Sequence, residues 1–266
     1  MTEAVYEFIT VDDAAPGVRR ITLNRPEKRN AINNGMRAEL FAALEAADVD
    51  DTVHVTIMRG AGPCFSSGYD LKRGALDDRP YYTAGGDGSW SRHVTEGWVR
   101  IWDLAKPVIA QVHGYAMAGG TELVAACDLV YVAHDATFSY PVVRVISPPD
   151  FQYHPWLVGM RNAMELVLTG DPITGDDAVR MGLANRAFPA DELDARVLAV
   201  AERIAGVPAE LLQINKRSVH RAMEIMGIRT GIRAGSELQG LASKLPAVQA
   251  LLQGDAIASV KQAADH

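Results

Sequence analysis

The sequence predicts an α/β fold, and three observations support this class. Short apolar or β-branched runs alternate with segments of helical periodicity between residues 18 and 135, an order typical of parallel strands joined by crossover helices. The 266 residues are 48% hydrophobic and 22% charged, which suits a soluble globular chain with one large core or two small ones. From residue 191 onward the patterns are helical only.

The predicted elements differ in their patterns. Strands are assigned to short β-branched or apolar runs, and helices to segments such as residues 33–49, where Met36, Leu40 and Leu44 recur every four positions on one face. The stretch 74–90 is rich in Gly, Asp and Tyr without periodicity, so we expect a pocket-shaping loop. In order, the predictions are a strand at 18–23, a helix at 33–49, a strand at 53–58, a loop at 74–90, a helix at 93–104, a strand at 108–114, a helix at 120–126 and a strand at 129–135.

The C-terminal part of the chain is predicted to be helical throughout. Residues 191–208, 209–227 and 235–254 each form a helical pattern with Gly or Pro at its end. A section of roughly 70 residues is too thin to build a core alone, so it must pack on the α/β core or on another subunit. We therefore divide the chain into a core, residues 1–195, and a C-terminal helical region, residues 196–266, and expect an oligomer.

Charge and cysteine content exclude several classes of protein. With 26 Lys and Arg against 33 Asp and Glu, the formal charge is −7, so no basic surface for nucleic acid is expected. Cys64 and Cys127 lack the spacing of a metal site or a disulfide framework, which favours a reducing cytoplasm. No signal-peptide core and no apolar run of about 18 residues occurs, so we expect no export and no membrane partner.

Residues 113–128 (HGYAMAGGTELVAACD) contain the first candidate for chemistry. Gly119 and Gly120 precede a predicted helix, where free backbone N–H groups can bind an anion and a ligand can approach closely. Glu122 follows among apolar residues, and burial would raise the pKa of its carboxyl group, which suits a proton carrier. The alternative is structural: the glycines allow close packing, and the helix dipole favours Glu122 near the helix start.

Residues 65–72 (FSSGYDLK) form the second candidate. Ser66, Ser67 and Gly68 make a tight polar turn directly after a strand, so the N–H groups of Gly68 and Tyr69 can face the Gly119 corner. Two convergent N–H donors form an oxyanion hole, which stabilises the negative charge that a thioester oxygen gains during reaction. Taken alone, however, the segment is simply a turn.

Four segments together carry a family resemblance. Residues 24–32 (NRPEKRNAI), 65–72, 106–128 and 168–188 (LTGDPITGDDAVRMGLANRAF) resemble, in order and spacing, the crotonase or enoyl-CoA hydratase/isomerase superfamily, over roughly residues 5 to 220. The resemblance implies a spiral of ββα turns as the CoA-thioester core, and a helical region that assembles a homotrimer or a dimer of trimers. It also implies an acyl-CoA substrate, with coenzyme A as part of the thioester and with neither prosthetic group nor metal.

The resemblance also assigns residues to the site. Tyr69 and Gly119 would supply the oxyanion-hole N–H groups, and Glu122 would be the acid/base. The residues implied to bind coenzyme A are Ser67, Tyr69, Asp70 and Leu71 around adenine and pantetheine, Arg25, Lys28 and Lys72 at the phosphates, and Lys216 near the nucleotide. For each basic residue, a solvated surface position is the alternative.

One departure from the family pattern concerns the second acidic residue. Family hydratases use two glutamates to add water, and the second position holds Val142, which cannot bind or deprotonate water. The segment 147–155 (SPPDFQYHP) also replaces a Gly-rich stretch, so the acyl pocket is expected to be remodelled. The candidates for the vacant role are Asp150, His154, Tyr140, His93 and the Tyr69 side chain, although each could equally be a packing, turn or cap residue.

A single base beside an oxyanion hole still supports several reactions through an enolate, including double-bond isomerisation and thioester hydrolysis. The leading expectation is an acyl-CoA enzyme of the enoyl-CoA hydratase/isomerase type. The alternatives are an acyl-CoA hydrolase or decarboxylase on the same scaffold, or a non-catalytic CoA-binding subunit.

Overall fold

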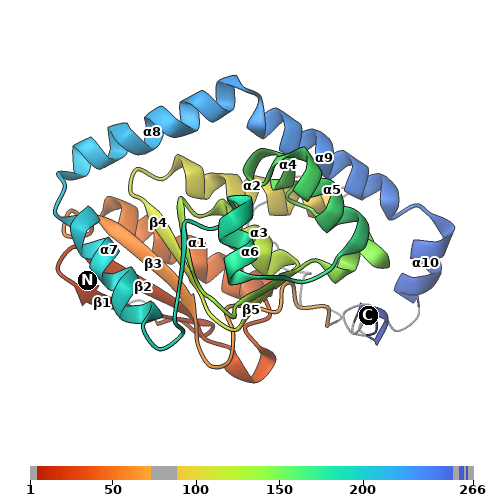
Figure 1. The fold of residues 1–266 in the computed structure, drawn as a ribbon, viewed down its shortest axis with the longest axis horizontal. Helices are drawn as coiled ribbons and strands as arrows, with labels where there is room; N and C mark the ends of the chain where they lie inside the picture. Colours follow the sequence, from red (N-terminus) through yellow and green to blue (C-terminus); the bar gives the residue numbers. More distant parts are fainter. Residues whose placement is uncertain (1–4, 73–88, 254–257, 261, 263–266) are drawn as a thin grey trace.

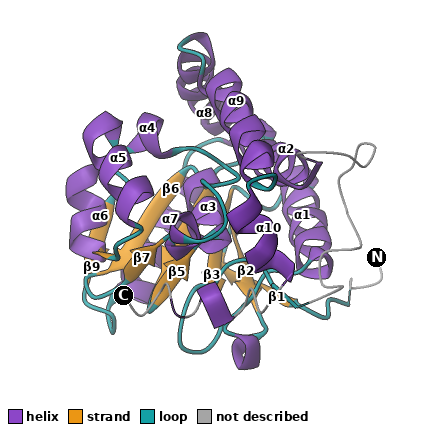
Figure 2. Cartoon of the chain, turned by 90° about the vertical axis from the view of Figure 1, so that its right-hand side faces the viewer, coloured by secondary structure: helices purple, strands orange, loops and turns teal. Residues whose placement is uncertain are grey.

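Two β-sheets organise the chain, which a computed structural model describes for residues 5–72, 89–253, 258–260 and 262. The larger sheet has the strand order β1-β2-β3-β4-β6-β9, and all its neighbours are parallel except the β1–β2 pair. Helices surround this sheet (Figure 2), and the predicted α/β class is confirmed. Its strands are β1 (Ile9–Ala15), β2 (Val18–Leu23), β3 (Val55–Gly60), β4 (Val108–Val112), β6 (Leu129–Ala133) and β9 (Arg186–Phe188).

The smaller sheet positions the site. It consists of β5 (Tyr115–Met117), β7 (Thr137–Ser139) and β8 (Ile173–Thr174). The chain passes from β4 in the large sheet to β5 in the small one and then into a helix, and β6 and β7 repeat the step; these are turns of a ββα spiral. An isolated β-bridge joins Ser66 to Ala116 of β5 and places the turn at 66–69 beside this strand. A second bridge joins Tyr69 to Ile32.

The helices of the core bury the predicted apolar faces. Met36, Leu40 and Leu44 of α1 are each at most 2% exposed, and the Asn33 side chain caps this helix by accepting from the Met36 N–H at 2.7 Å. The helices up to the C-terminal region are α1 (Asn34–Val49), α2 (Ser89–Asp103), α3 (Gly119–Ala126), α4 (His154–Leu157), α5 (Gly159–Thr169), α6 (Gly175–Met181) and α7 (Leu193–Ala205), with short 3-10 turns at Pro26–Lys28 and Pro141–Arg144.

Two sequence predictions need correction in this part. The predicted loop lies outside the described residues as far as position 88, but its last two residues, Ser89 and Trp90, already belong to α2. The predicted strand at 53–58 begins at Val55 and ends at Gly60. The second error concerns only the boundaries, since the strand itself is present.

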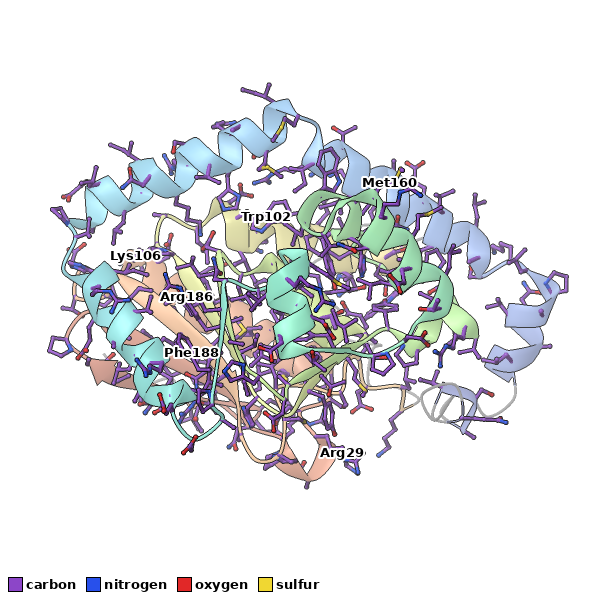
Figure 3. The ribbon with its side chains drawn as sticks, in the orientation of Figure 1. Arg29, Trp102, Lys106, Met160, Arg186 and Phe188 are labelled. Carbon is purple, nitrogen blue, oxygen red and sulfur yellow. The ribbon has the colours of Figure 1, made fainter. Side chains whose placement is uncertain are left out.

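The C-terminal helices extend beyond the core, as Figures 1 and 2 show. The prediction of one helix over 235–254 is wrong, because one helix ends at Ala242 and another begins at Pro246. Trp102, at the end of α2, lies under the bend between α8 and α9 (Figure 3), with its ring centroid 5.5 Å from that of His220. The helices are α8 (Ala209–Ile225), α9 (Ile228–Ala242) and α10 (Pro246–Gln253). In the described part of the chain, no helix has the length and apolar character of a membrane span.

Candidate active site

The two turns that the sequence singles out lie side by side. The Met117 N–H donates to the Ser66 oxygen at 3.0 Å, and the Ser66 N–H donates to the Tyr115 oxygen at 3.2 Å. Gly68 has a φ of +94°, and a Cβ atom there would lie only 3.2 Å from the Gly119 nitrogen and 2.7 Å from the Met117 oxygen. Glycine is therefore required at 68 for the turns to approach each other.

The backbone N–H groups of Tyr69 and Gly119 are not used by the fold. Around Tyr69, the Ile32 N–H donates to the Gly68 oxygen and the Asp70 N–H donates to the Ile32 oxygen, which leaves the Tyr69 N–H out of the ladder. Gly119 is the first residue of α3, where an N–H has no partner within the helix. Neither N–H has an acceptor among the residues that the structure describes. Two donors from adjacent turns are the geometry that an oxyanion hole needs.

Glu122 is fully buried and held by four donors. Its Oε2 accepts from the Tyr69 hydroxyl at 2.5 Å, and its Oε1 accepts from the Tyr140 hydroxyl at 2.8 Å. Oε1 also accepts from the backbone N–H groups of Asp150, at 2.9 Å, and Phe151, at 3.2 Å. Burial raises the pKa of Glu122, whereas these hydrogen bonds act in the opposite direction.

Asp150, whose backbone N–H is one of these donors, provides a second buried carboxyl group. It is 5% exposed, and its Oδ2 accepts from the Trp90 indole N–H at 3.4 Å. Its Oδ1 is buried without a hydrogen-bond partner within the described residues. Burial, and next the charge of Glu122, raise the pKa of Asp150 well above its ordinary value, against smaller opposing effects of Trp90 and Arg37. Burial and the neighbouring charge therefore shift the equilibrium of Asp150 toward its neutral form.

A cavity of about 260 Å³ is lined by Asp150 and by the rings of Tyr69 and Tyr140. It is bounded by the turn at 67–71, by the segment that holds Val142 and Asp150, and by α9. Glu122 does not line it, since the hydroxyl-bearing rings of Tyr69 and Tyr140 do so instead. The lining residues are Ser67, Tyr69, Leu71, Trp90, Ala118, Tyr140, Val142, Ile146, Ser147, Asp150, Gln239, Ser243 and Val260.

The Tyr69 side chain fills the space between the glycine turn and Glu122. A Cβ atom on Gly119 would lie 2.5 Å from the Tyr69 ring, so the ring and a larger residue at 119 exclude each other. The Tyr69 hydroxyl accepts from the Trp98 indole N–H at 2.9 Å and donates to Glu122. Burial raises the pKa of Tyr69 well above its ordinary value, so the hydroxyl stays neutral and acts as a donor.

The two candidate histidines do not line this cavity. His154 is 3% exposed and stacks on Tyr153 at a centroid distance of 4.0 Å, and burial lowers the pKa of His154 to about 4, which keeps it neutral. His93 is buried in α2, with its ring centroid 5.7 Å from that of Trp90. Of the five candidates for the vacant role, the structure thus brings Asp150, Tyr140 and Tyr69 to the cavity.

The residues implied to bind coenzyme A fall into two groups. Ser67, Tyr69 and Leu71 line the cavity. Asp70 lies next to it and is engaged by the protein, because its Oδ2 accepts from the Arg25 guanidinium at 3.1 Å and its Oδ1 from the Lys72 N–H at 3.0 Å. The side chains of Lys28 and Lys72 are exposed and remain available to a phosphate.

Lys216 requires a correction. Its side chain is only 4% exposed, and its ammonium group lies 2.8 Å from Asp128. It also donates to the backbone oxygens of Ile101, at 2.9 Å, and Lys106, at 3.1 Å. An ammonium group has three protons, and all three are used within this chain. Lys216 therefore fastens α8 to the core instead of facing a nucleotide.

Several residues around the site had no clear signal in the sequence. Arg37 is fully buried, donates to the His93 backbone oxygen at 3.2 Å, and lies 5.1 Å from the centroid of the Trp98 ring. In the sequence it looks like a surface cation on an amphipathic helix. The Phe151 N–H that binds Glu122 was likewise not predictable, since backbone donors carry no residue-type signal.

Comparison with known proteins identifies the family of this chain. The sequence model of the enoyl-CoA hydratase/isomerase family matches residues 13–247. EchA13 of Mycobacterium tuberculosis is 39% identical over 251 residues, which cover 85% of this chain and 78% of that protein. The mitochondrial enoyl-CoA hydratase of Pongo abelii is 32% identical over 84% of this chain and 76% of its own length.

Solved structures lead to the same family. An enoyl-CoA hydratase/isomerase from Xanthobacter autotrophicus Py2 matches with a TM-score of 0.87 and 34% identity, over 97% of this chain and 96% of that one. An enoyl-CoA hydratase from Mycobacterium smegmatis matches with a TM-score of 0.86 and 31% identity, over 97% and 91%. The predicted crotonase-like fold is thereby confirmed, and the chain belongs to the enoyl-CoA hydratase/isomerase family of acyl-CoA-processing enzymes.

Proposed function

We propose that this enzyme moves protons on an unsaturated acyl-CoA, with Asp150 as the group that exchanges the proton with the substrate. The observation that carries the proposal is the Asp150 carboxyl group, which lines the cavity, is 5% exposed and has an Oδ1 without a partner in the described structure. In this mechanism the thioester oxygen accepts hydrogen bonds from the Tyr69 and Gly119 N–H groups, which stabilise the enolate that forms when a carbon-bound proton leaves.

Glu122 and Asp150 then act as an unequal pair of carboxyl groups. Glu122 accepts four hydrogen bonds, which favour its charged form. Its charge in turn favours the protonated form of Asp150, which accepts only the hydrogen bond from Trp90. During proton transfer the ionised form of Asp150 takes a proton from one carbon, and the resulting neutral carboxyl group returns it to another carbon; a raised pKa makes the carboxylate a stronger base for the first half of this cycle. Glu122 takes part in acid/base chemistry through this pairing and through the hydroxyls of Tyr69 and Tyr140.

Double-bond isomerisation is the reaction that this arrangement favours. Isomerisation needs one carboxyl group that reaches two carbons, whereas hydration also needs a held water molecule. Val142 lines the cavity where family hydratases have their second glutamate, and its side chain offers no hydrogen bond to water. Hydration is the second candidate, since Asp150 brings a second carboxyl group to the cavity and the relatives compared above include enoyl-CoA hydratases.

The proposed position of coenzyme A is beside the turn at 67–71. Ser67 and Leu71 line the cavity, and Leu71 is also 41% exposed to solvent. The exposed ammonium groups of Lys28 and Lys72 are the proposed phosphate contacts. Arg25 supports the turn through its ion pair with Asp70, in which both side chains are 14% exposed.

We also propose a homotrimer, or a dimer of trimers, assembled through the C-terminal helices. The support is the apolar surface that the single chain leaves exposed. On α5, Met160, Met164 and Leu168 recur every four positions and are 68%, 54% and 72% exposed, and on α8, Ile214 is 64% exposed. Exposed apolar side chains in such a row are typical of an interaction surface.

The product distinguishes the two reactions. The enzyme is incubated with 2-enoyl-CoA and 3-enoyl-CoA thioesters, and the masses of the products are measured by mass spectrometry. A product of unchanged mass with a shifted double bond supports isomerisation. A mass gain of one water molecule supports hydration. Release of free thiol or of CO2 would instead indicate the hydrolase or decarboxylase alternative. If neither coenzyme A nor any acyl-CoA raises the melting temperature at millimolar concentration, the proposal is overturned.

A further inference from the structure

One wall of the cavity is a polar face of α9. Gln239 and Ser243 line the cavity, and Ser236 lies one turn earlier, where its hydroxyl donates to the Asp150 backbone oxygen at 3.0 Å. Positions 236, 239 and 243 share one helix face and extend over about 10 Å along the axis. The cavity therefore joins the Asp150 carboxyl group to Gln239 and to Ser243, the C-cap residue of α9. We call this row, together with Ser236, which is buried and does not line the cavity, the α9 strip (Ser236, Gln239, Ser243).

Helix α2 fixes the orientation of this strip. The buried Ser91 hydroxyl donates to the Gln239 Oε1 at 2.7 Å, and one turn later the Thr95 and Ser236 hydroxyls lie 2.7 Å apart. Because its oxygen is held by Ser91, the Gln239 side chain has only its NH2 group left for another partner. In the described part of the chain this group donates to no acceptor. Gln239 thus offers a hydrogen-bond donor to a molecule in the cavity.

The remaining lining of the cavity indicates which partner this donor suits. Among the described lining residues there is no lysine, arginine or histidine, and Asp150 contributes a carboxyl group. A carboxylate on the bound molecule would find no counter-ion among these described residues and would be repelled by Asp150 when that group is ionised. The Ser147 hydroxyl adds a group that can donate and accept, whereas the Ser243 hydroxyl donates to the Gly240 oxygen at 2.7 Å and is left as an acceptor. An uncharged oxygen fits this set, whereas a purely apolar chain would cover the Gln239 NH2 group without satisfying it, which is unfavourable.

We propose that the preferred acyl chain carries an uncharged oxygen, as a hydroxyl or a ketone, several carbons beyond the thioester, and that the Gln239 NH2 group binds it. The inference rests on the proposed function, since it assumes a CoA thioester in the same cavity. Gln239 is a specificity-determining residue in this view and takes no part in proton transfer. Its distance along α9 from the Asp150 contact, three residues or about 4.5 Å, separates the two roles.

A matched pair of saturated ligands tests the inference without turnover. Binding of octanoyl-CoA and of its ω-hydroxy derivative is measured by calorimetry for the wild type, for Gln239→Leu and for Gln249→Leu. We expect the wild type to bind the hydroxylated ligand about tenfold more tightly, the value of one hydrogen bond between uncharged groups. Gln239→Leu should bind the two ligands equally. Gln249 is exposed on α10, so Gln249→Leu should keep the wild-type preference.

The outcomes separate this inference from the proposed function. Equal dissociation constants for the two ligands in the wild type would overturn the inference and leave the proposed function intact, because both thioesters still bind. A tenfold preference that survives in Gln239→Leu would overturn the role of Gln239. Failure of the wild type to bind any CoA thioester would overturn both. If Gln239→Leu does not fold, Ser243→Ala, which removes a single oxygen, must reduce the preference for the inference to stand.

Discussion

Asp150 and Glu122 share one buried site but differ in their hydrogen bonds. Both oxygens of Glu122 accept hydrogen bonds from the protein, whereas Asp150 keeps one oxygen without a partner in the described structure. The more satisfied group is the better anion, and the less satisfied one is the better proton carrier. The difference gives the two carboxyl groups different roles although their residue types are nearly alike.

Replacing Asp150 by asparagine is expected to separate activity from stability. Asp150→Asn keeps an acceptor for the Trp90 N–H but cannot carry a proton, so kcat should fall by about 10² to 10⁴ while KM changes little. Because the pKa of Asp150 is raised in the folded state, protonation of this group contributes to the stability of the wild type at acid pH. This contribution is lost as the pH rises through the raised pKa. The Tm of Asp150→Asn should therefore exceed that of the wild type at pH 8, and the difference should shrink toward pH 4. A Tm difference that is independent of pH would contradict the raised pKa.

Replacing Glu122 by glutamine tests the pairing. In Glu122→Gln, an NH2 group replaces one of the two oxygens that now accept hydrogen bonds. Donors that face this NH2 group lose their acceptor, at a cost of about 1–3 kcal/mol for an unsatisfied group, so Tm should fall. Because the charge beside Asp150 disappears, the pKa of Asp150 should fall as well, and the pH profile of the residual activity should move to lower pH. An unmoved profile would show that Glu122 does not act through Asp150.

Helix α3 begins at Gly119, a position where the Tyr69 ring leaves no room for a side chain. In Gly119→Ala, the new Cβ atom would lie 2.5 Å from the Tyr69 ring, so the ring must move away from Glu122. Alanine keeps the N–H of residue 119, but displacement of the ring would shift the turn that carries the Tyr69 N–H. We expect kcat/KM to fall by about 100-fold or more, the usual effect of losing one oxyanion donor. The matched control is Gly206→Ala, where the nearest atom would be 3.5 Å away. An active Gly119→Ala enzyme would contradict the proposed oxyanion hole.

Elements differed in how well the sequence predicted them. The helix at Asn34–Val49 was predicted within one residue, because three core side chains repeat every four positions. The small-sheet strands, of two or three residues each, were not predicted, since so few residues cannot show an alternating pattern. The strand at Ile9–Ala15 was also missed. Its partly exposed acidic residues lower its strand propensity.

The candidate site was predictable in its residue types but not in its contacts. Glycine spacing and Glu122 identified the turns, and Asp150 was one of five candidates for the vacant role. The choice among them depends on contacts such as the Tyr69 hydroxyl with Glu122, 53 positions apart in the sequence. The misassignment of Lys216 has the same origin, because its burial depends on Asp128, which belongs to another part of the fold.

At the scale of the molecule, the buried Lys216–Asp128 pair joins the projecting helix α8 to the core. Lys216→Met would remove the ammonium group from Asp128, whose side chain is 11% exposed and which keeps only His220 and the Val108 N–H as partners among the described residues. Breaking a buried pair costs up to about 3–5 kcal/mol. We expect a lower Tm with little change in the KM for acyl-CoA. Lys28→Met, at an exposed position, should raise the KM for acyl-CoA and leave Tm nearly unchanged. A raised KM without a Tm change in Lys216→Met would restore the nucleotide role.

The proposed assembly makes a second prediction at this scale. Light scattering after size-exclusion chromatography should give three or six times the chain mass of 28.7 kDa. Met164→Glu places a charge in the exposed apolar row of α5 and should lower that mass by weakening the interface. A monomer in the wild type would contradict the proposed trimer.

The most direct measurement of the proton-transfer mechanism is solvent deuterium exchange into an enoyl-CoA. The substrate is incubated in D2O with the wild type and with Asp150→Asn, and deuterium in the acyl group is counted by mass spectrometry, while calorimetry measures binding. We predict rapid incorporation with the wild type, and at least about 100-fold slower incorporation with Asp150→Asn at unchanged affinity. Incorporation by Asp150→Asn at the wild-type rate would contradict the central role of this carboxyl group.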